Sequence, residues 1–135
     1  MKKILLFLLA LVTVAACSRI RPIEEPVIPI PVGVESTTAI KLLGPIMIER
    51  GWAVTDVTKD SLVAKLDQRE HSVTIKAAVI DSSIKLQYVA SEGLRFTEKD
   101  GTRYIHRRYQ TWIKNLEMDL QKALSKALVE SKLKL

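Results

Sequence analysis

Apolar and polar residues alternate with a period of two through the middle of the chain, in residues 62–66, 73–79 and 84–90. This period is typical of strands with one buried face, because successive side chains of a strand point to opposite sides. Residues 52–57 are predicted as a further strand. The breaks between the strands are short and polar: residues 58–60, 68–71 and 81–83. Such breaks suit hairpins, so the four strands are expected to form an antiparallel meander in chain order.

A helix is expected before the strands, over residues 37–50. Its apolar positions recur at helical spacing: Ile40, Leu43 and Met47. Ser36 or Thr37 can cap its amino end, and Gly51 can end it. Pro45 lacks a backbone donor and is expected to bend or interrupt this helix.

A second, longer helix is expected from Ile105 onward. Its apolar residues keep an i, i+3, i+4 rhythm: Tyr109, Trp112, Ile113, Leu116, Leu120, Ala123, Leu124, Ala127 and Leu128. An apolar helix face of this length fits the apolar face of the meander. The predicted fold class is therefore α+β, a two-layer sandwich in the order α-β-β-β-β-α. It contains a four-stranded antiparallel meander with two helices on one face.

The start of the chain has the pattern of an export signal. Lys2 and Lys3 precede an uncharged apolar run over residues 4–14, which closes on small residues. This run is shorter than the ~20 residues that a membrane-spanning helix needs. Residues 1–16 are therefore predicted to be a signal peptide.

The segment Val14-Ala15-Ala16-Cys17 resembles the lipobox of bacterial lipoproteins. The resemblance implies diacylglycerol on the Cys17 thiol, cleavage between Ala16 and Cys17, and acylation of the new amino terminus, typically with palmitate. The alternative is an ordinary secretory peptide that is cut near Ala15 or Ala16. Cys17 is the chain's one cysteine and stands where lipidation needs it.

Lipidation at Cys17 would hold the chain on a membrane without a membrane-binding surface on the body, since several acyl chains anchor a protein essentially permanently. In Gram-negative bacteria, an Asp after the lipidated cysteine favours retention in the inner membrane. Ser18 occupies that position here. The expected location is the outer membrane, with the body facing the periplasm.

Residues 17–35 are expected to comprise the lipidated cysteine and a proline-rich tether, ahead of a body over residues 36–135. Four of the chain's five prolines fall in this segment: Pro22, Pro26, Pro29 and Pro31. Extended at ~3.1 Å per residue, they would hold the body roughly 30 Å from the anchor. The segment also has apolar residues that are poorly suited to water: Val27, Ile28, Ile30, Val32 and Val34. We therefore expect part of residues 27–34 to dock on the body or on a partner.

The composition favours one exported domain with a mildly basic surface. With 47% apolar residues, the body can build a single core. Loss of Lys2 and Lys3 with the leader takes the formal net charge from +6 to +4. For an exported protein, this charge points to an envelope protein or an anionic lipid as partner and makes nucleic acid an unexpected one.

Catalytic and cofactor motifs are missing from the sequence, so we expect neither an enzyme nor a cofactor. Two Ser-x-x-Lys occurrences, at residues 82–85 and 131–134, are attributed to chance. His71 and His106 belong to different predicted elements and have no cysteine pair or carboxylate cluster beside them. A metal site is therefore not expected.

A basic cluster at the start of the last helix is the candidate anion or partner site. It consists of Arg103, His106, Arg107 and Arg108. Cations are unfavourable at a helix amino end, where the helix dipole favours anions. Two explanations remain open. Either a phosphate or carboxylate ligand supplies the counter-charge, or it comes from water or from a preceding carboxylate, namely Glu92, Glu98 or Asp100.

Several local motifs resemble a family of small, uncharacterised proteobacterial lipoproteins. The motifs are Gly51-Trp52, the run over residues 88–94, and the Ile-His, Tyr, Trp-Ile and Asn-Leu pattern within residues 104–116. The resemblance covers the leader and most of the body. It implies localisation and fold and brings no activity.

The predicted function is that of a noncatalytic, lipid-anchored cell-envelope protein whose periplasmic domain binds or scaffolds another envelope component. The alternative is a carrier or sensor of an anionic amphiphile, such as a lipopolysaccharide or phospholipid head group.

Overall fold

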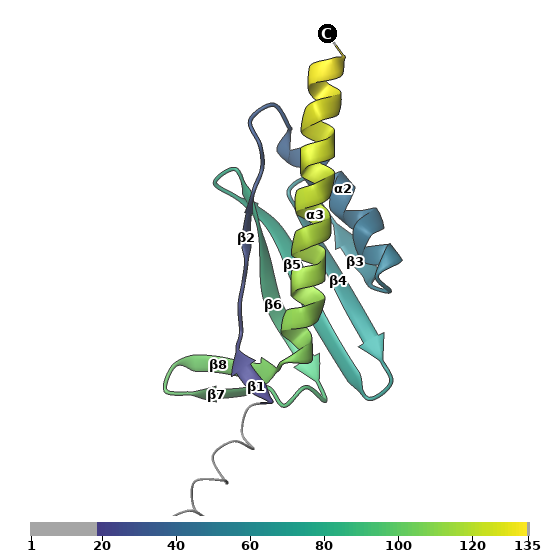
Figure 1. The fold of residues 1–135 in the computed structure, drawn as a ribbon. Helices are drawn as coiled ribbons and strands as arrows, with labels where there is room; N and C mark the ends of the chain where they lie inside the picture. Colours follow the sequence, from purple (N-terminus) through teal and green to yellow (C-terminus); the bar gives the residue numbers. More distant parts are fainter. Residues whose placement is uncertain (1–18, 135) are drawn as a thin grey trace, which may run out of the picture.

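The computed structural model describes residues 19–134 as an α+β fold with two antiparallel sheets (Figure 1). The helices are α2 (Ser36–Glu49) and α3 (Arg108–Leu133). The strands are β1 (Ile20–Pro22), β2 (Val27–Pro29), β3 (Ala53–Val57), β4 (Ser61–Gln68), β5 (His71–Ile80), β6 (Ser83–Glu92), β7 (Thr97–Lys99) and β8 (Thr102–His106). The predicted leader, its cleavage position and Cys17 lie outside the described residues.

The larger sheet has the strand order β2-β6-β5-β4-β3, and the smaller one has the order β1-β8-β7. The four predicted strands are present in chain order as β3 to β6. The prediction of a four-stranded sheet is nevertheless wrong, because β2 adds a fifth strand beside β6 and a second sheet forms. Strands of three residues, such as β1, β2 and β7, are too short to show a period-two pattern.

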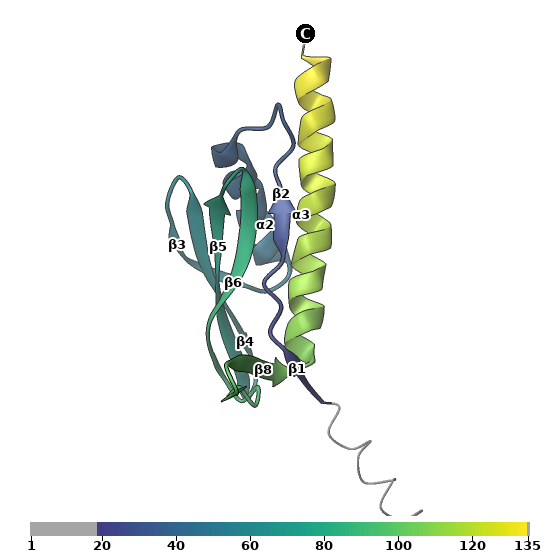
Figure 2. The ribbon, with the colours of Figure 1, turned by 90° about the vertical axis from the view of Figure 1, so that its left-hand side faces the viewer.

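The predicted apolar face of the meander is buried against the helices. Figure 2 shows α2 and α3 on one side of the larger sheet. The strands contribute alternate residues to the core: Leu62, Ala64, Leu66, Val73, Ile75, Ala77, Ile84 and Leu86. Ala90 departs from the prediction because a register shift between Thr74 and Ile75 pairs it with Thr74, and it is exposed.

Helix α2 runs through Pro45, so the predicted interruption does not occur. Pro45 lies on the exposed side of the helix. The predicted side-chain cap is also absent, because the cap position is Glu35 and makes no side-chain bond. The predicted stop at Gly51 is confirmed. Gly51 has a φ of 89°, and its N–H donates to the Ile48 carbonyl. The Trp52 N–H donates to the Met47 carbonyl at 2.9 Å, which completes a Schellman motif.

Helix α3 begins at Arg108 rather than at Ile105, which is a buried residue of β8. Its predicted apolar stripe is otherwise confirmed. The fully covered side chains are Tyr109, Ile113, Leu116, Leu120 and Leu124. They join α2 and the larger sheet in one core.

The proline-rich segment lies along the body and does not extend away from it. Strand β1 pairs with β8, and β2 pairs with β6. Ile28 is 1% exposed and faces Ile84 in the β2–β6 register, so the predicted docking of this segment is confirmed. The ~30 Å spacer is correspondingly wrong for the described residues. Burial of Ile28 and Ile30 and pairing of the open β6 edge outweigh the extended, solvated conformation that prolines favour.

Candidate functional site

Six exposed arginines lie at the end of the body where the described chain begins, and we call this the basic end. They are Arg19, Arg21, Arg69, Arg95, Arg107 and Arg108. They come from β1, the β4–β5 turn, the loop after β6 and the start of α3, which lie together in both views of the fold (Figures 1 and 2). Within residues 19–134, none of the six has a carboxylate within 4.0 Å.

Backbone hydrogen bonds hold the basic end together. The Arg107 N–H donates to the Arg19 carbonyl at 2.9 Å, and the His106 N–H donates to the Leu94 carbonyl at 2.8 Å. The His71 ring bonds through Nδ1 to the Gly93 carbonyl, also at 2.8 Å. The loop after β6 thus bonds to both histidines and links the β4–β5 turn to the start of α3.

Gly93 makes this close approach possible. Its φ is 73°, and a Cβ at this position would overlap the carbonyl oxygen of Glu70. Only glycine fits both the left-handed backbone and the contact with the turn.

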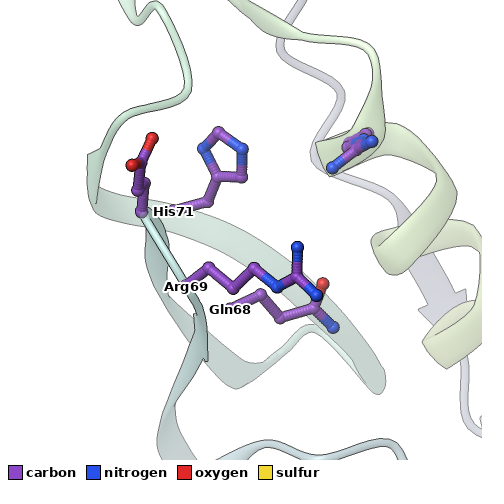
Figure 3. Close-up of a pocket in the computed structure, with 5 residues that line it drawn as sticks. Gln68, Arg69 and His71 are labelled. Carbon is purple, nitrogen blue, oxygen red and sulfur yellow. The ribbon is translucent and has the colours of Figure 1, made fainter.

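Two hollows flank Arg108. The first, of about 660 Å³, is lined by Gln68, Arg69, Glu70, His71 and Arg108. Figure 3 shows Gln68 and Arg69 extending side by side from the β4–β5 turn, with the His71 ring on the same side of the turn. The second, of about 520 Å³, is lined by Glu24, Arg107, Arg108, Gln110, Thr111 and Lys114. Both hollows combine guanidinium groups with amide or hydroxyl donors, a combination suited to anionic oxygens.

His106 lies beside the arginines and caps the start of α3. Its Nδ1 accepts a hydrogen bond from the Arg108 N–H at 3.1 Å. Burial, and then the charges of Arg108, Arg107 and Arg95, lower the pKa of His106 below its ordinary value. Both this lowered pKa and the hydrogen bond favour the neutral ring, because only a neutral imidazole has a nitrogen that can accept.

The structure separates Arg103 from the other three members of the predicted cluster. Arg103 Nη2 donates to Glu25 Oε1 at 3.0 Å, and its guanidinium lies 5.8 Å from the centre of the Tyr88 ring. Glu25 Oε2 also accepts from the Tyr88 N–H at 2.9 Å. Glu25 belongs to the segment read as a tether, so the sequence offered no reason to pair it with Arg103. Among the described ion pairs, none involves Glu92, Glu98 or Asp100.

The two histidines, which belong to different elements in the prediction, are close enough for His71 to contribute to the lowered pKa of His106. No group of three potential metal-ligating side chains occurs within residues 19–134.

Two hollows are lined by residues of both α2 and α3. A hollow of about 780 Å³ is lined by Ile46, Glu49, Arg50, Asp119, Lys122, Ala123 and Lys126. A second, of about 270 Å³, is lined by Gly33, Val34, Glu35, Thr38, Leu42, Ala127, Glu130, Ser131 and Lys134. The second hollow uses the following turns of α3 and the preceding turns of α2, so the two hollows succeed one another along the helix pair. Arg50 and Asp119 bridge the helices through two hydrogen bonds, of 2.8 and 3.2 Å.

The second hollow lies at the far end of the molecule, where α3 extends beyond the sheet (Figure 1) and exposed apolar residues adjoin the lining residues in the chain. Val32 is 98% exposed and Leu133 79%. We call the second hollow together with Val32 and Leu133 the distal surface. It lies at the opposite end of α3 from the basic end.

Comparison with known families gives one match, at the amino terminus. Residues 1–18 match the prokaryotic membrane lipoprotein lipid attachment site. This match supports a lipoprotein that is anchored to a membrane through a lipidated Cys17. No curated protein and no solved structure matches the chain. In the part that the structure describes, no helix has both the length and the apolar character needed to cross a membrane.

Proposed function

We propose that the protein is a noncatalytic, lipid-anchored envelope scaffold whose distal surface binds a protein partner. The observation that carries this proposal is the hollow at the end of α3, whose lining includes Val34, Leu42 and Ala127, with the exposed Val32 and Leu133 next to its lining residues. Apolar side chains gathered beside a hollow are typical of interaction surfaces.

The shape and chemistry of the distal surface fit an apolar peptide or helix of a partner. Leu42, Val34 and Ala127 line the hollow, while Glu130 and Lys134 stand among its polar lining residues. An apolar centre with polar groups around it is the usual arrangement of a protein interface. A partner segment would lie between α2 and α3, as amphipathic helices do in grooves of this kind.

The location belongs to the same proposal. Ser18 follows Cys17 in place of the aspartate associated with inner-membrane retention. We place the protein on the outer membrane, with its body in the periplasm. The distal surface would then face a periplasmic protein or the periplasmic domain of a membrane protein.

Site-specific crosslinking in cells tests the scaffold proposal. A photo-crosslinking residue replaces Val32 or Leu133, and a control replaces Lys76 on the open sheet face. One protein, identified by mass spectrometry, should crosslink from both distal positions and not from Lys76. The second change Ala127→Glu, at a residue that lines the hollow, should abolish the adduct. Absence of a protein adduct, or the same adduct from Lys76, would contradict the proposal.

A carrier or sensor of an anionic amphiphile is the second candidate, and the hollow beside Arg69 and Arg108 favours it. Such a carrier would copurify with a stoichiometric amphiphile when isolated without detergent. Lipid extraction and mass spectrometry measure this directly. If no amphiphile copurifies with the protein, the carrier function is excluded and the scaffold proposal stands alone.

A further inference from the structure

The lipid anchor and the basic end are joined by a very short piece of chain. Cys17 precedes Arg19 by two residues, and two residues span at most about 7 Å. Arg19 is itself fastened to the body, because its carbonyl accepts from the Arg107 N–H at 2.9 Å. Residues 20–22 and 27–29, which could have served as a spacer, are paired into the sheets. The end of the body that carries Arg19 and Arg107 must therefore stay close to the membrane that holds the lipid.

The groups at this end are suited to phosphate. The six arginines of the basic end form no ion pair within the described chain, so their charges are available to a ligand. Guanidinium groups bind phosphate oxygens in a bidentate manner, whereas lysine ammonium groups act as point charges. The open sheet face, by contrast, presents lysines: Lys65, Lys76 and Lys85.

We propose that the basic end docks on the membrane that holds the anchor, and that its exposed arginines bind the phosphates of anionic phospholipid head groups. In this orientation the basic end contacts the membrane and the distal surface points away from the membrane. The lipid supplies permanent attachment, and the arginines supply orientation.

A phospholipid is favoured over a soluble anion because of the short connection to Cys17. Tethering raises the effective concentration of head groups around Arg19, Arg107 and Arg108 without any further contact. Each basic residue near an anionic membrane surface contributes about a fivefold gain in binding. The arginines at this end have no carboxylate partners within the described chain, so docking breaks no ion pair.

The test uses the mature lipidated protein in vesicles. Lipidation occupies Cys17, so a single introduced cysteine can be labelled with a fluorophore. Gln68→Cys reports on the basic end, and Ser125→Cys reports on the exposed side of α3. Quenching by a nitroxide on the lipid head group gives the ratio of docked to undocked protein. We expect the Gln68 label to be quenched more strongly on vesicles with phosphatidylglycerol than on phosphatidylcholine alone, with the Ser125 label unquenched on both.

Two triple variants with equal charge loss separate specific docking from general attraction. Arg69→Gly, Arg95→Gly and Arg107→Gln remove charge from the basic end. The glycines also relieve left-handed backbone, since Arg69 has a φ of 55° and Arg95 a φ of 56°. The control variant changes Lys65, Lys76 and Lys85 to Gln. The arginine variant should lower the docking ratio by about fivefold per residue, and the lysine variant should leave it unchanged.

Three results would overturn the proposal. In the first, quenching at Gln68 is the same on neutral and anionic vesicles. In the second, the lysine variant loses docking as much as the arginine variant. In the third, millimolar inorganic phosphate removes the extra quenching at Gln68 on phosphatidylglycerol vesicles, which would show that the site binds soluble anions. Failure of this test leaves the distal crosslinking experiment unaffected, because the two surfaces lie at opposite ends.

Discussion

Replacement of Ile28 by alanine should destabilise the body strongly, although Ile28 lies in a segment whose prolines suggest a free tether. Its side chain is 1% exposed and faces Ile84, which is 0% exposed, across the β2–β6 pair. Truncation of a buried isoleucine to alanine removes the transfer free energy of three carbon atoms and leaves a cavity. The expected loss is about 3 kcal/mol, within the range of 2–5 kcal/mol found for such changes. Every 1.4 kcal/mol is about tenfold, so the folding equilibrium should fall by roughly a hundredfold.

Val27→Ala is the matched control for this prediction. Val27 belongs to the same strand but is 58% exposed on the other face, so its loss should cost less than about 0.5 kcal/mol. Urea unfolding of the unlipidated mature chain, followed by the fluorescence of the buried Trp52, measures both values. If Ile28→Ala lies within 0.5 kcal/mol of wild type, or is equal to Val27→Ala, the segment does not dock and the reasoning fails.

Four further outcomes are expected. Tyr109→Phe should leave stability unchanged or raise it by up to about 1 kcal/mol in urea unfolding, because the buried Tyr109 hydroxyl has no hydrogen-bond partner within residues 19–134; a loss above that size would reveal a partner. Glu25→Ala should cost about 2 kcal/mol by the same assay, since Arg103 and the Tyr88 N–H lose their acceptor, and Glu25→Gln should cost less. Thermal unfolding at several pH values should show that stability falls as the pH drops below about 6.5, the ordinary pKa of histidine, and continues to fall through the lowered pKa of His106. The reason is that the unfolded chain binds a proton on His106 more tightly than the folded chain does. His106→Gln should reduce that acid loss, and an unchanged pH profile would exclude His106 as its source. Gly93→Ala should lower the melting temperature, and an undiminished value would show that the turn can move away.

Periodic patterns predicted those elements whose side chains are sorted locally. The alternation in β4, β5 and β6 and the stripe from Tyr109 to Leu124 identify the apolar face of each element before any partner is known. Ile105 was assigned to the last helix for the same reason. It is apolar and one helical turn before Tyr109, but it is buried in β8. An apolar residue next to a helix fits either element, and only the pairing with β1 decides between them.

The candidate site was predicted only in part because its members meet through contacts between distant segments. His106, Arg107 and Arg108 adjoin in sequence and remain together. Arg69, in the β4–β5 turn, and Arg95, in the loop after β6, join them because His71 and His106 both bond to that loop. No spacing in the sequence indicates these contacts. Arg103 is withdrawn from the group by Glu25, a residue 78 positions away.

The sequence by itself determined the membrane anchor, the meander, the two amphipathic helices and the basic character of the region before α3. Each depends on residue types and their spacing within one short segment. Only the tertiary structure decided that the proline-rich segment is part of both sheets, and that Arg69, Arg95, Arg107 and Arg108 gather at the end of the body where Arg19 follows Cys17 by two residues. Strand pairing is a non-local choice: β6 leaves an open edge, Ile28 fills a gap in the core, and the sum of these contacts exceeds the preference of the prolines for an extended chain in water.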